Sequence, residues 1–458
     1  MRTSVLIADA LAAAAMVAAP VSAGHGPFAA PPIDPSAPAH VAIDPRIAVA
    51  RDGTATVVWS EFDQARSTGE DAGLVAVAAT RRAGGAFSAP ADLSGGGLDS
   101  TLPQVAVAPD GTAVAAWQQG TADEQMIRAA ARSPGGRFSA PADLSAPGQF
   151  ASEPHVAVAR DGTSAVVWAS RAGGTWTVQA ATRSGGGAFS APADLSAPGQ
   201  SASTPRVALG PDGTATAVWT RLDGAMWIVQ AATRPPGGGF SAAVDVSAPD
   251  QSASDPRIAV AADGTATVVW SRSSGRNWIV QAATRRPGGG FSTPVDLSAP
   301  GRSAATPRIA VAADGTATVV WRRSSGRNWI VQAATRPPGG GFSTPVDLSA
   351  PGRSALEPEV AVAPDGTAAV VWRRSDGAND IIQAATRRRG GRFSDPVDLS
   401  APGRSASRPQ VAVAPDGTVT VVWMRRTIRI VNGIWNWGVQ ASTRLAGRSF
   451  SAPVDLSS

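Results

Sequence analysis

The chain of 458 residues contains no cysteine, no tyrosine and no lysine, so all 40 of its basic residues are arginines. The absence of cysteine excludes a disulfide framework, a thiolate metal site and a catalytic thiol. The absence of tyrosine and lysine excludes a tyrosine nucleophile and a Schiff-base lysine. Beyond residue 40 the only histidine is His155, so we predict neither a metal centre built from histidines nor any cofactor.

Positive charge is neither large nor clustered. The net charge of +5 is modest for this length, and most arginines recur at fixed intervals. Nucleic-acid-binding proteins concentrate their positive charge on one patch or stripe, so nucleic acid is not favoured as a partner.

The N-terminus has the features of a secretory signal. Arg2 precedes an apolar stretch, and the small residues at 21–23 form a cleavage site before Gly24. We therefore predict a signal peptide over residues 1–23 and a short N-terminal segment over residues 24–43. No later apolar run is long enough for a membrane helix. We expect a secreted, extracellular monomer that does not insert into a membrane.

What the chain does contain is a repeat. The motif x-P-x-[IV]-A-[VL] recurs eight times, with an interval of 51 residues from the second copy onward and 58 before it. The landmark prolines are Pro45, Pro103, Pro154, Pro205, Pro256, Pro307, Pro358 and Pro409. A tryptophan after an Asp-Gly pair keeps the same register, at Trp59, Trp117, Trp168, Trp219, Trp270, Trp321, Trp372 and Trp423. Copies five and six differ at only four of 51 positions, which predicts equivalent structural units.

Each copy reads as four short strands. In copy five, residues 257–261, apolar after the first, precede an Asp-Gly turn, and residues 265–270, rich in β-branched side chains, follow it. Residues 278–284 and 291–298 form two more runs, separated by a Pro-Gly-Gly-Gly turn. Tandem sandwiches of this size would be too small to hold a core. We predict an all-β, eight-bladed β-propeller of four-stranded antiparallel blades over residues 44–458, with the repeated tryptophans in the core between blades.

An extra copy of the fourth strand precedes the first repeat. The segment from Phe28 to Ser36 is similar to the "FSAPADLSAP" of later copies. We predict that it closes the ring by pairing with the blade of copy eight; the alternative is that it lies outside the ring.

The turn between the third and fourth strands resembles that of sialidase-type, BNR-repeat propellers. Their degenerate Asp-box has the form S-x-D-x-G-x-T-W, and here Thr284 to Phe291 keeps the hydroxyl, the central glycine and the closing aromatic but lacks the aspartate. The resemblance implies a propeller fold. It does not imply sialidase activity, because that family uses a tyrosine nucleophile and this chain has no tyrosine.

The copies diverge beside the landmark proline. The residues after and before it are expected to flank the start of the innermost strand and so to surround one mouth of the central channel. They can be a solvated, charge-balanced rim or a polar ligand site. The candidates chosen here are His155, Arg206, Arg257, Arg308, Glu357 and Glu359.

The loop between the second and third strands is longer in copies one and eight than elsewhere. In copy eight it brings Trp435 close to Arg425, a combination that suits stacking against a glycan or contact with a protein. The neighbouring Trp437 is expected to fill the structural position of Trp278 and Trp329.

Taken together, these features favour a secreted binding or scaffold protein that recognises an acidic polysaccharide, a cell-surface polymer or a protein ligand at one mouth of the channel. The alternative is a glycan-processing enzyme, a hydrolase or a lyase, that uses carboxylates at this mouth. The available carboxylates are Asp44, Glu153, Asp255, Glu357 and Glu359, and no spacing selects a pair among them.

Overall fold

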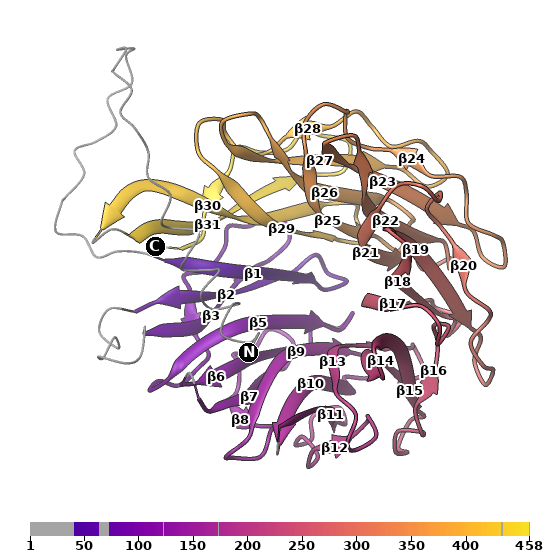
Figure 1. Cartoon of the computed structure of the whole chain (residues 1–458). Coiled ribbons are helices and arrows are strands. Elements are labelled where there is room, and N and C mark those ends of the chain that lie inside the picture. The colour runs from indigo at the N-terminus through magenta and orange to yellow at the C-terminus, as the bar shows by residue number, and fades with distance from the viewer. Residues whose placement is uncertain (1–40, 64–72, 122, 173, 432–433, 458) are drawn as a thin grey trace, which may run out of the picture.

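The computed structural model describes residues 41–457 apart from 64–72, 122, 173 and 432–433, and this part of the chain consists of strands and turns without a helix. Thirty-two strands form eight four-stranded antiparallel sheets arranged around a ring (Figure 1). Each sheet uses four consecutive strands, so that each repeat forms one blade. The predicted eight-bladed β-propeller is confirmed. Among the described residues there is accordingly no helix of a length and hydropathy suited to crossing a membrane.

The first strand of each blade lies innermost. Successive first strands are neighbours around the ring, and the last of them lies beside the first. They are β1 (Ala42–Val49), β5 (Asp99–Val107), β9 (Phe150–Val158), β13 (Ala202–Leu209), β17 (Ala253–Val260), β21 (Ala304–Val311), β25 (Ala355–Val362) and β29 (Ala406–Val413). Most of their side chains are half-buried, which shows that solvent reaches the inner wall of the ring.

The second and third strands form the middle of each blade. The second strands are β2 (Ala55–Phe62), β6 (Ala113–Gly120), β10 (Ser164–Ala172), β14 (Ala215–Asp223), β18 (Ala266–Ser274), β22 (Ala317–Ser325), β26 (Ala368–Ser375) and β30 (Val419–Val431). The third strands are β3 (Leu74–Arg81), β7 (Gln125–Arg132), β11 (Thr175–Arg183), β15 (Met226–Arg234), β19 (Asn277–Arg285), β23 (Asn328–Arg336), β27 (Asp380–Arg387) and β31 (Ile434–Arg444). The Asp-Gly turns join first to second strands. In blade five Gly264 has a φ of 79°, and Asp263 Oδ1 accepts a hydrogen bond from the Thr265 amide at 2.8 Å.

The fourth strands are short outer edges. They are β4 (Ala91–Asp92), β8 (Ala142–Asp143), β12 (Ala193–Asp194), β16 (Val244–Asp245), β20 (Val295–Asp296), β24 (Val346–Asp347), β28 (Val397–Asp398) and β32 (Val454–Asp455). Their aspartates accept a hydrogen bond from a third-strand side chain in seven blades; for example, Gln281 Nε2 donates to Asp296 Oδ1 at 2.7 Å.

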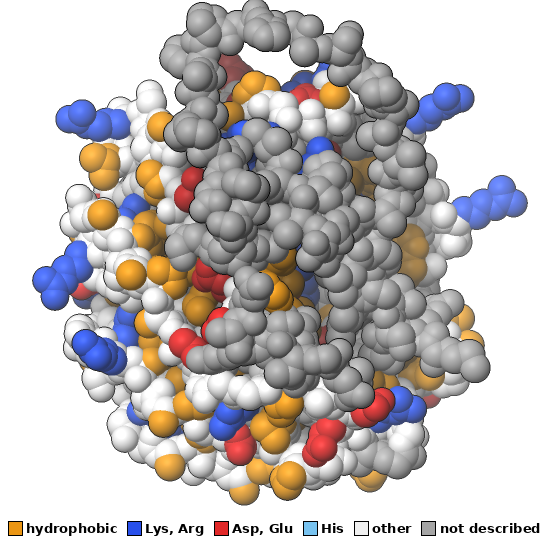
Figure 2. All heavy atoms as spheres, turned by 90° about the vertical axis from the view of Figure 1, so that its left-hand side faces the viewer, with side chains coloured by type: hydrophobic (Ala, Val, Ile, Leu, Met, Phe, Trp, Pro, Cys, Tyr) orange, Lys and Arg blue, Asp and Glu red, His pale blue; other side chains and the backbone are white. Residues whose placement is uncertain are grey.

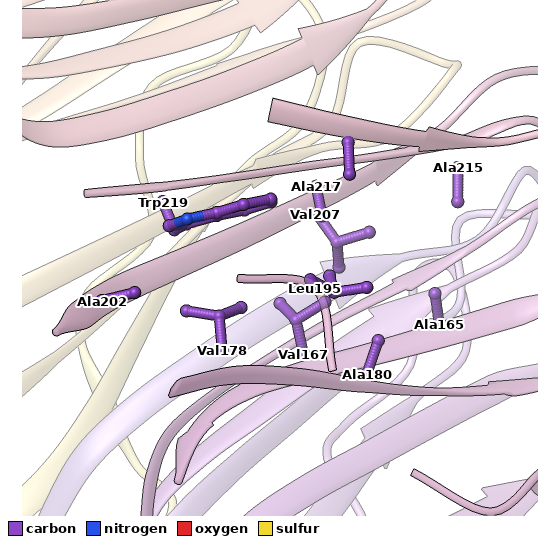
Figure 3. Packing of buried hydrophobic residues seen from close by; sticks show 11 residues of the cluster. Ala165, Val167, Val178, Ala180, Leu195, Ala202, Val207, Ala215, Ala217 and Trp219 are labelled. Carbon is purple, nitrogen blue, oxygen red and sulfur yellow. The ribbon is translucent and has the colours of Figure 1, made fainter. Parts of the chain in front are cut away.

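The core lies between blades rather than within them. Eight hydrophobic clusters occur, one at each interface between neighbouring blades. Figure 3 shows the interface of blades three and four, where Trp219 lies near Val167, Val178 and Leu195. All eight repeated tryptophans are fully buried, as predicted. Ring-shaped repetition thus gives each small sheet two buried faces.

Blades eight and one close the ring with the same kind of contact. Ala42 and Trp59 pack against Val422 and Val439 in one cluster. Arg81 of blade one also donates to Thr420 Oγ1 of blade eight at 2.7 Å. Blade eight is completed by its own β32, which pairs with β31. The segment from Phe28 to Ser36, predicted to pair there, lies outside the described residues.

A β-bulge interrupts every first strand at the landmark proline. In blade five, Ser254 pairs with Ser271, the register then shifts, and Arg257 pairs with Val269. Proline has no N–H to give to the ladder, and the residue before it takes a positive φ, 51° at Asp255. The strand therefore begins earlier than the sequence suggested. Arg257 lies in the middle of β17 and not at its start, which places the predicted rim residues inside the ring.

Candidate functional site

Two sets of side chains follow one another along the inner wall. The acidic tier consists of the residues with positive φ before each landmark proline: Asp44, Leu102, Glu153, Thr204, Asp255, Thr306, Glu357 and Arg408. The basic tier consists of the residues after each landmark proline: Arg46, Gln104, His155, Arg206, Arg257, Arg308, Glu359 and Gln410. The first set has four carboxylates and one arginine, and the second has four arginines and one carboxylate. The two tiers carry opposite net charge.

Most arginines of the basic tier have no acidic partner. The exception is Arg308, whose Nε lies 2.7 Å from Glu359 Oε1. Arg206 and Arg257 each donate one hydrogen bond from Nη1 to the carbonyl of the preceding proline, at 2.7 and 2.9 Å. Arg46 of blade one does the same at 2.9 Å. Among the described residues none of these three guanidinium groups forms an ion pair, so several of their N–H donors remain available.

The arginines of the basic tier lie close enough together to lower one another's pKa. Burial lowers the pKa of Arg257 well below its usual value, and the positive charges of Arg206 and Arg308 lower it further. Burial likewise lowers the pKa of Arg206 to about 10, with Glu153 opposing this effect and Arg308 and Arg46 adding to it. Burial lowers the pKa of Arg308 too, but its ion pair with Glu359 outweighs this and raises the pKa. An anion bound at the basic tier reduces the repulsion between these guanidinium groups.

His155 contributes a neutral ring to the basic tier. Burial lowers its pKa well below 6.5, and Arg206, Arg257 and Arg46 lower it further. Its Nδ1 accepts a hydrogen bond from the Val207 amide at 3.3 Å. In the neutral imidazole the proton is then on Nε2, which can donate to a ligand.

The half-buried His155 predicts a specific pH dependence of stability. Because the pKa of His155 is lower in the folded chain than in the unfolded chain, the unfolded state takes up the proton first as the pH falls. Stability is therefore full above pH 6.5 and is lost below it, by at most about 1.4 kcal/mol per pH unit. Urea unfolding at pH 7 and pH 5 should show this loss.

The variant His155→Gln is the matched control, because Gln104 and Gln410 occupy the same position in other blades. This variant should remove the dependence of stability on pH between pH 7 and pH 5. Carboxylates with a lowered pKa, such as Asp212 and Asp314, titrate below 3.8 and lie outside this range. Equal losses in both proteins would contradict the assignment to His155.

Several of the carboxylates considered for acid–base chemistry form contacts between neighbouring blades. Glu153 Oε2 accepts a hydrogen bond from the Thr204 amide at 2.9 Å, one blade further on. Glu357 Oε2 accepts from the Arg408 amide at 2.8 Å. Its Oε1 lies 3.3 Å from Arg373 Nε.

The remaining tier contacts also join blades. Asp44 forms an ion pair with Arg408, which links blades one and eight. Within the described part of the chain, no three His, Asp or Glu residues are grouped so as to hold a metal ion. The arrangement favours structural roles for the acidic tier.

The candidates on the long loop of blade eight do not join the basic tier. Arg425 Nη1 donates to Gln440 Oε1 at 3.2 Å, between the second and third strands and away from the inner wall. Trp437 pairs with Arg426, in the register that Trp278 and Trp329 occupy in their blades, as expected. The backbone of Trp435 pairs with Ile430, but its side chain lies outside the described ones. Sequence reasoning also left Arg46 out of the site, although it follows a landmark proline as the others do.

No protein-family model and no curated protein sequence matches the chain. Solved structures with a similar fold include a protein of unknown function from Dyadobacter fermentans DSM 18053, with 12% identity, a TM-score of 0.44 and coverage of 88% of this chain and 94% of that one. A polysaccharide lyase of family PL25, an ulvan lyase, has 10% identity, a TM-score of 0.49 and coverage of 73% and 90%. An α-L-arabinanase from Penicillium chrysogenum has 11% identity, a TM-score of 0.39 and coverage of 76% and 93%.

At these TM-scores and identities the similarities assign neither a substrate nor an activity to this chain. The resemblance to sialidase-type repeats stays a prediction.

Proposed function

We propose that this protein is an exported β-propeller that binds the acidic group of a ligand on the basic tier, and that the ligand is an acidic glycan or cell-surface polymer. The observation that carries the proposal is the set of three guanidinium groups, at Arg46, Arg206 and Arg257, that share the inner wall without a carboxylate partner. The N-terminal sequence of residues 1–23 supports export.

A carboxylate or sulfate fits this site for two physical reasons. First, it removes the mutual repulsion that helps to lower the pKa of Arg257. Second, it accepts charge-assisted hydrogen bonds from the free N–H groups, which are stronger than bonds between neutral groups. The neutral His155 adds a donor without adding positive charge. A uronate or a sulfated sugar carries such a group on a polar body.

Calorimetric titration with glucuronate tests the proposal, with glucose as the uncharged comparison. We expect glucuronate to bind, and the double variant Arg206→Gln/Arg257→Gln to bind it at least about tenfold more weakly, a difference of about 1.4 kcal/mol. Glutamine suits both positions, because Gln410 already donates from Nε2 to its own proline carbonyl at 2.9 Å.

The charge-matched control replaces Arg286 and Arg388, two exposed arginines in turns between third and fourth strands. It should leave glucuronate binding unchanged. If both double variants lose affinity equally, or if glucose binds as well as glucuronate does, the basic tier is not the site.

A further inference from the structure

One loop position differs between two sets of three consecutive blades. It lies five residues before the landmark proline, in the loop that joins one blade to the next. Before blades three, four and five this position holds Gln149, Gln200 and Gln251. Before blades six, seven and eight it holds Arg302, Arg353 and Arg404. Since the blades are equivalent in structure, the fold itself accepts glutamine here and does not require arginine.

The glutamines have a structural partner on the second strand. Gln200 Oε1 accepts a hydrogen bond from Arg221 Nη1 at 3.0 Å, and Gln251 forms the same contact with Arg272. The partner is always the second residue after the buried tryptophan. In blade three that position is Ser170, which contacts Gln149 Oε1 at 2.9 Å. In each of these contacts the glutamine oxygen accepts a hydrogen bond from the second-strand side chain.

In blades six to eight the two equivalent positions both hold arginine. The partner positions there hold Arg323, Arg374 and Arg425. In blade eight, burial and then the charge of Arg404 lower the pKa of Arg425. In blade seven, backbone hydrogen bonds and then both Arg353 and Arg374 lower the pKa of the exposed Asp376. The arginine arc is defined by these three pairs: Arg302 with Arg323, Arg353 with Arg374, and Arg404 with Arg425.

Each pair has two arginines but only one nearby carboxylate. Asp347 lies 3.7 Å from Arg323, Asp376 interacts with both Arg353 and Arg374, and Asp455 opposes the effect of Arg404 on Arg425. Arg302, Arg353 and Arg404 form no ion pair among the described residues, and the first two are exposed. Two like charges held side by side on a surface repel each other, and a bound anion removes that repulsion.

The arc follows one face of the ring. Blades six, seven and eight are consecutive, and their first strands are in contact. The loops between blades and those between second and third strands lie at the same ends of the strands, on the face that Figure 2 shows. Acidic side chains occupy this face in blade two, at Asp99, Asp123 and Glu124. Blade two therefore carries negative charge on the face where blades six to eight carry the arginine arc.

We propose that the arginine arc binds a linear polysaccharide that carries sulfate or carboxylate groups, with one group held by the arginine pair of each blade. The proposal deepens the proposed function, on which it rests for the class of ligand, but it uses residues separate from the basic tier. A polymer of regularly spaced anions matches pairs that recur once per blade. Three pairs acting together give a length-dependent affinity that no single pair provides.

The test uses heparin oligosaccharides of increasing length, labelled at one end, with binding followed by fluorescence anisotropy over a range of salt concentrations. The triple variant Arg302→Gln/Arg353→Gln/Arg404→Gln introduces the residue found at this position before blades three, four and five. For the full chain we expect affinity to rise with length until the three blades are spanned. In the triple variant this rise should disappear, and the slope of log affinity against log salt should fall by about three.

The control variant Arg286→Gln/Arg388→Gln/Arg448→Gln removes the same charge from exposed turns on the opposite face. It should keep both the length dependence and most of the affinity. Equal losses in the two triple variants, or an unchanged salt slope in the first, would overturn the arginine arc. Glucuronate titration of the first variant separates the two proposals: binding that persists there leaves the basic tier standing whatever happens to the arc.

Discussion

Replacing Trp270 by alanine is expected to destabilise the propeller by about 3–5 kcal/mol, the usual cost of removing a large aromatic side chain from a core. The indole is 0% exposed and packs against Val218 and Val229 of the preceding blade. Its loss therefore weakens the contact between blades four and five and not only blade five. Chemical denaturation monitored by circular dichroism measures the change in the free energy of unfolding.

The control is Val295→Ala in the same blade, at the outer fourth strand. Val295 is 50% exposed, and substitutions on such a surface usually change stability by less than about 0.5 kcal/mol. If both variants lost the same stability, the core would not lie between the blades. A large loss for Trp270→Ala alone supports the packing of neighbouring blades as the main stabilising contact.

The architecture was predictable because several independent signals repeat in one register. The Asp-Gly turns fix where first strands end, and the buried tryptophans mark the second strands. In the third strand, Gln281 lies opposite Trp270, so even the pairing register recurs with the period. A period of 51 residues leaves room for four strands and no helix. Composition, turn residues and spacing all predict the same eight-bladed propeller.

The position of Arg257 on the inner wall, and not at the mouth of the ring, was not predictable from the same signals. Residues 253–255 read Ala-Ser-Asp, which carries no apolar alternation, so the sequence gives no reason to extend the strand before the proline. The structure does so through the bulge, in which Asp255 takes a positive φ. Arg257 is thereby shifted from the mouth of the ring to its inner wall, where burial lowers its pKa.

The arginine pairs show a second limit of sequence reasoning. The change from Gln251 to Arg302 between equivalent loops is visible in the sequence. The side chain that this loop residue faces is not visible there, because it lies 21 residues further along the chain. The hydrogen bonds of Gln200 with Arg221 and of Gln251 with Arg272 show that the two positions are neighbours. Arg425 was selected for its nearness to Trp435, whereas the structure places it in such a pair.

Glu359→Gln is expected to change stability and anion binding in opposite directions. Glu359 is the only carboxylate of the basic tier, and its removal leaves Arg308 without its 2.7 Å ion pair. The variant should lose about 1–3 kcal/mol of stability, because hydrogen bonds between charged groups contribute about that much. It should also bind glucuronate about tenfold more tightly, since a fourth guanidinium group becomes available and no carboxylate opposes the ligand.

Glu124→Gln serves as the control, because it removes the same charge from an exposed loop of blade two and not from the inner wall. Its Oε1 accepts one hydrogen bond from the Gly148 amide at 2.8 Å, which the glutamine oxygen can still accept. Sulfate should restore the stability of Glu359→Gln and have little effect on Glu124→Gln, because only the former leaves four unpaired guanidinium groups around one axis. A tighter glucuronate complex in both variants would show that total charge and not the basic tier sets the affinity. Weaker binding in Glu359→Gln would mean that the carboxylate orients Arg308 for the ligand instead of competing with it.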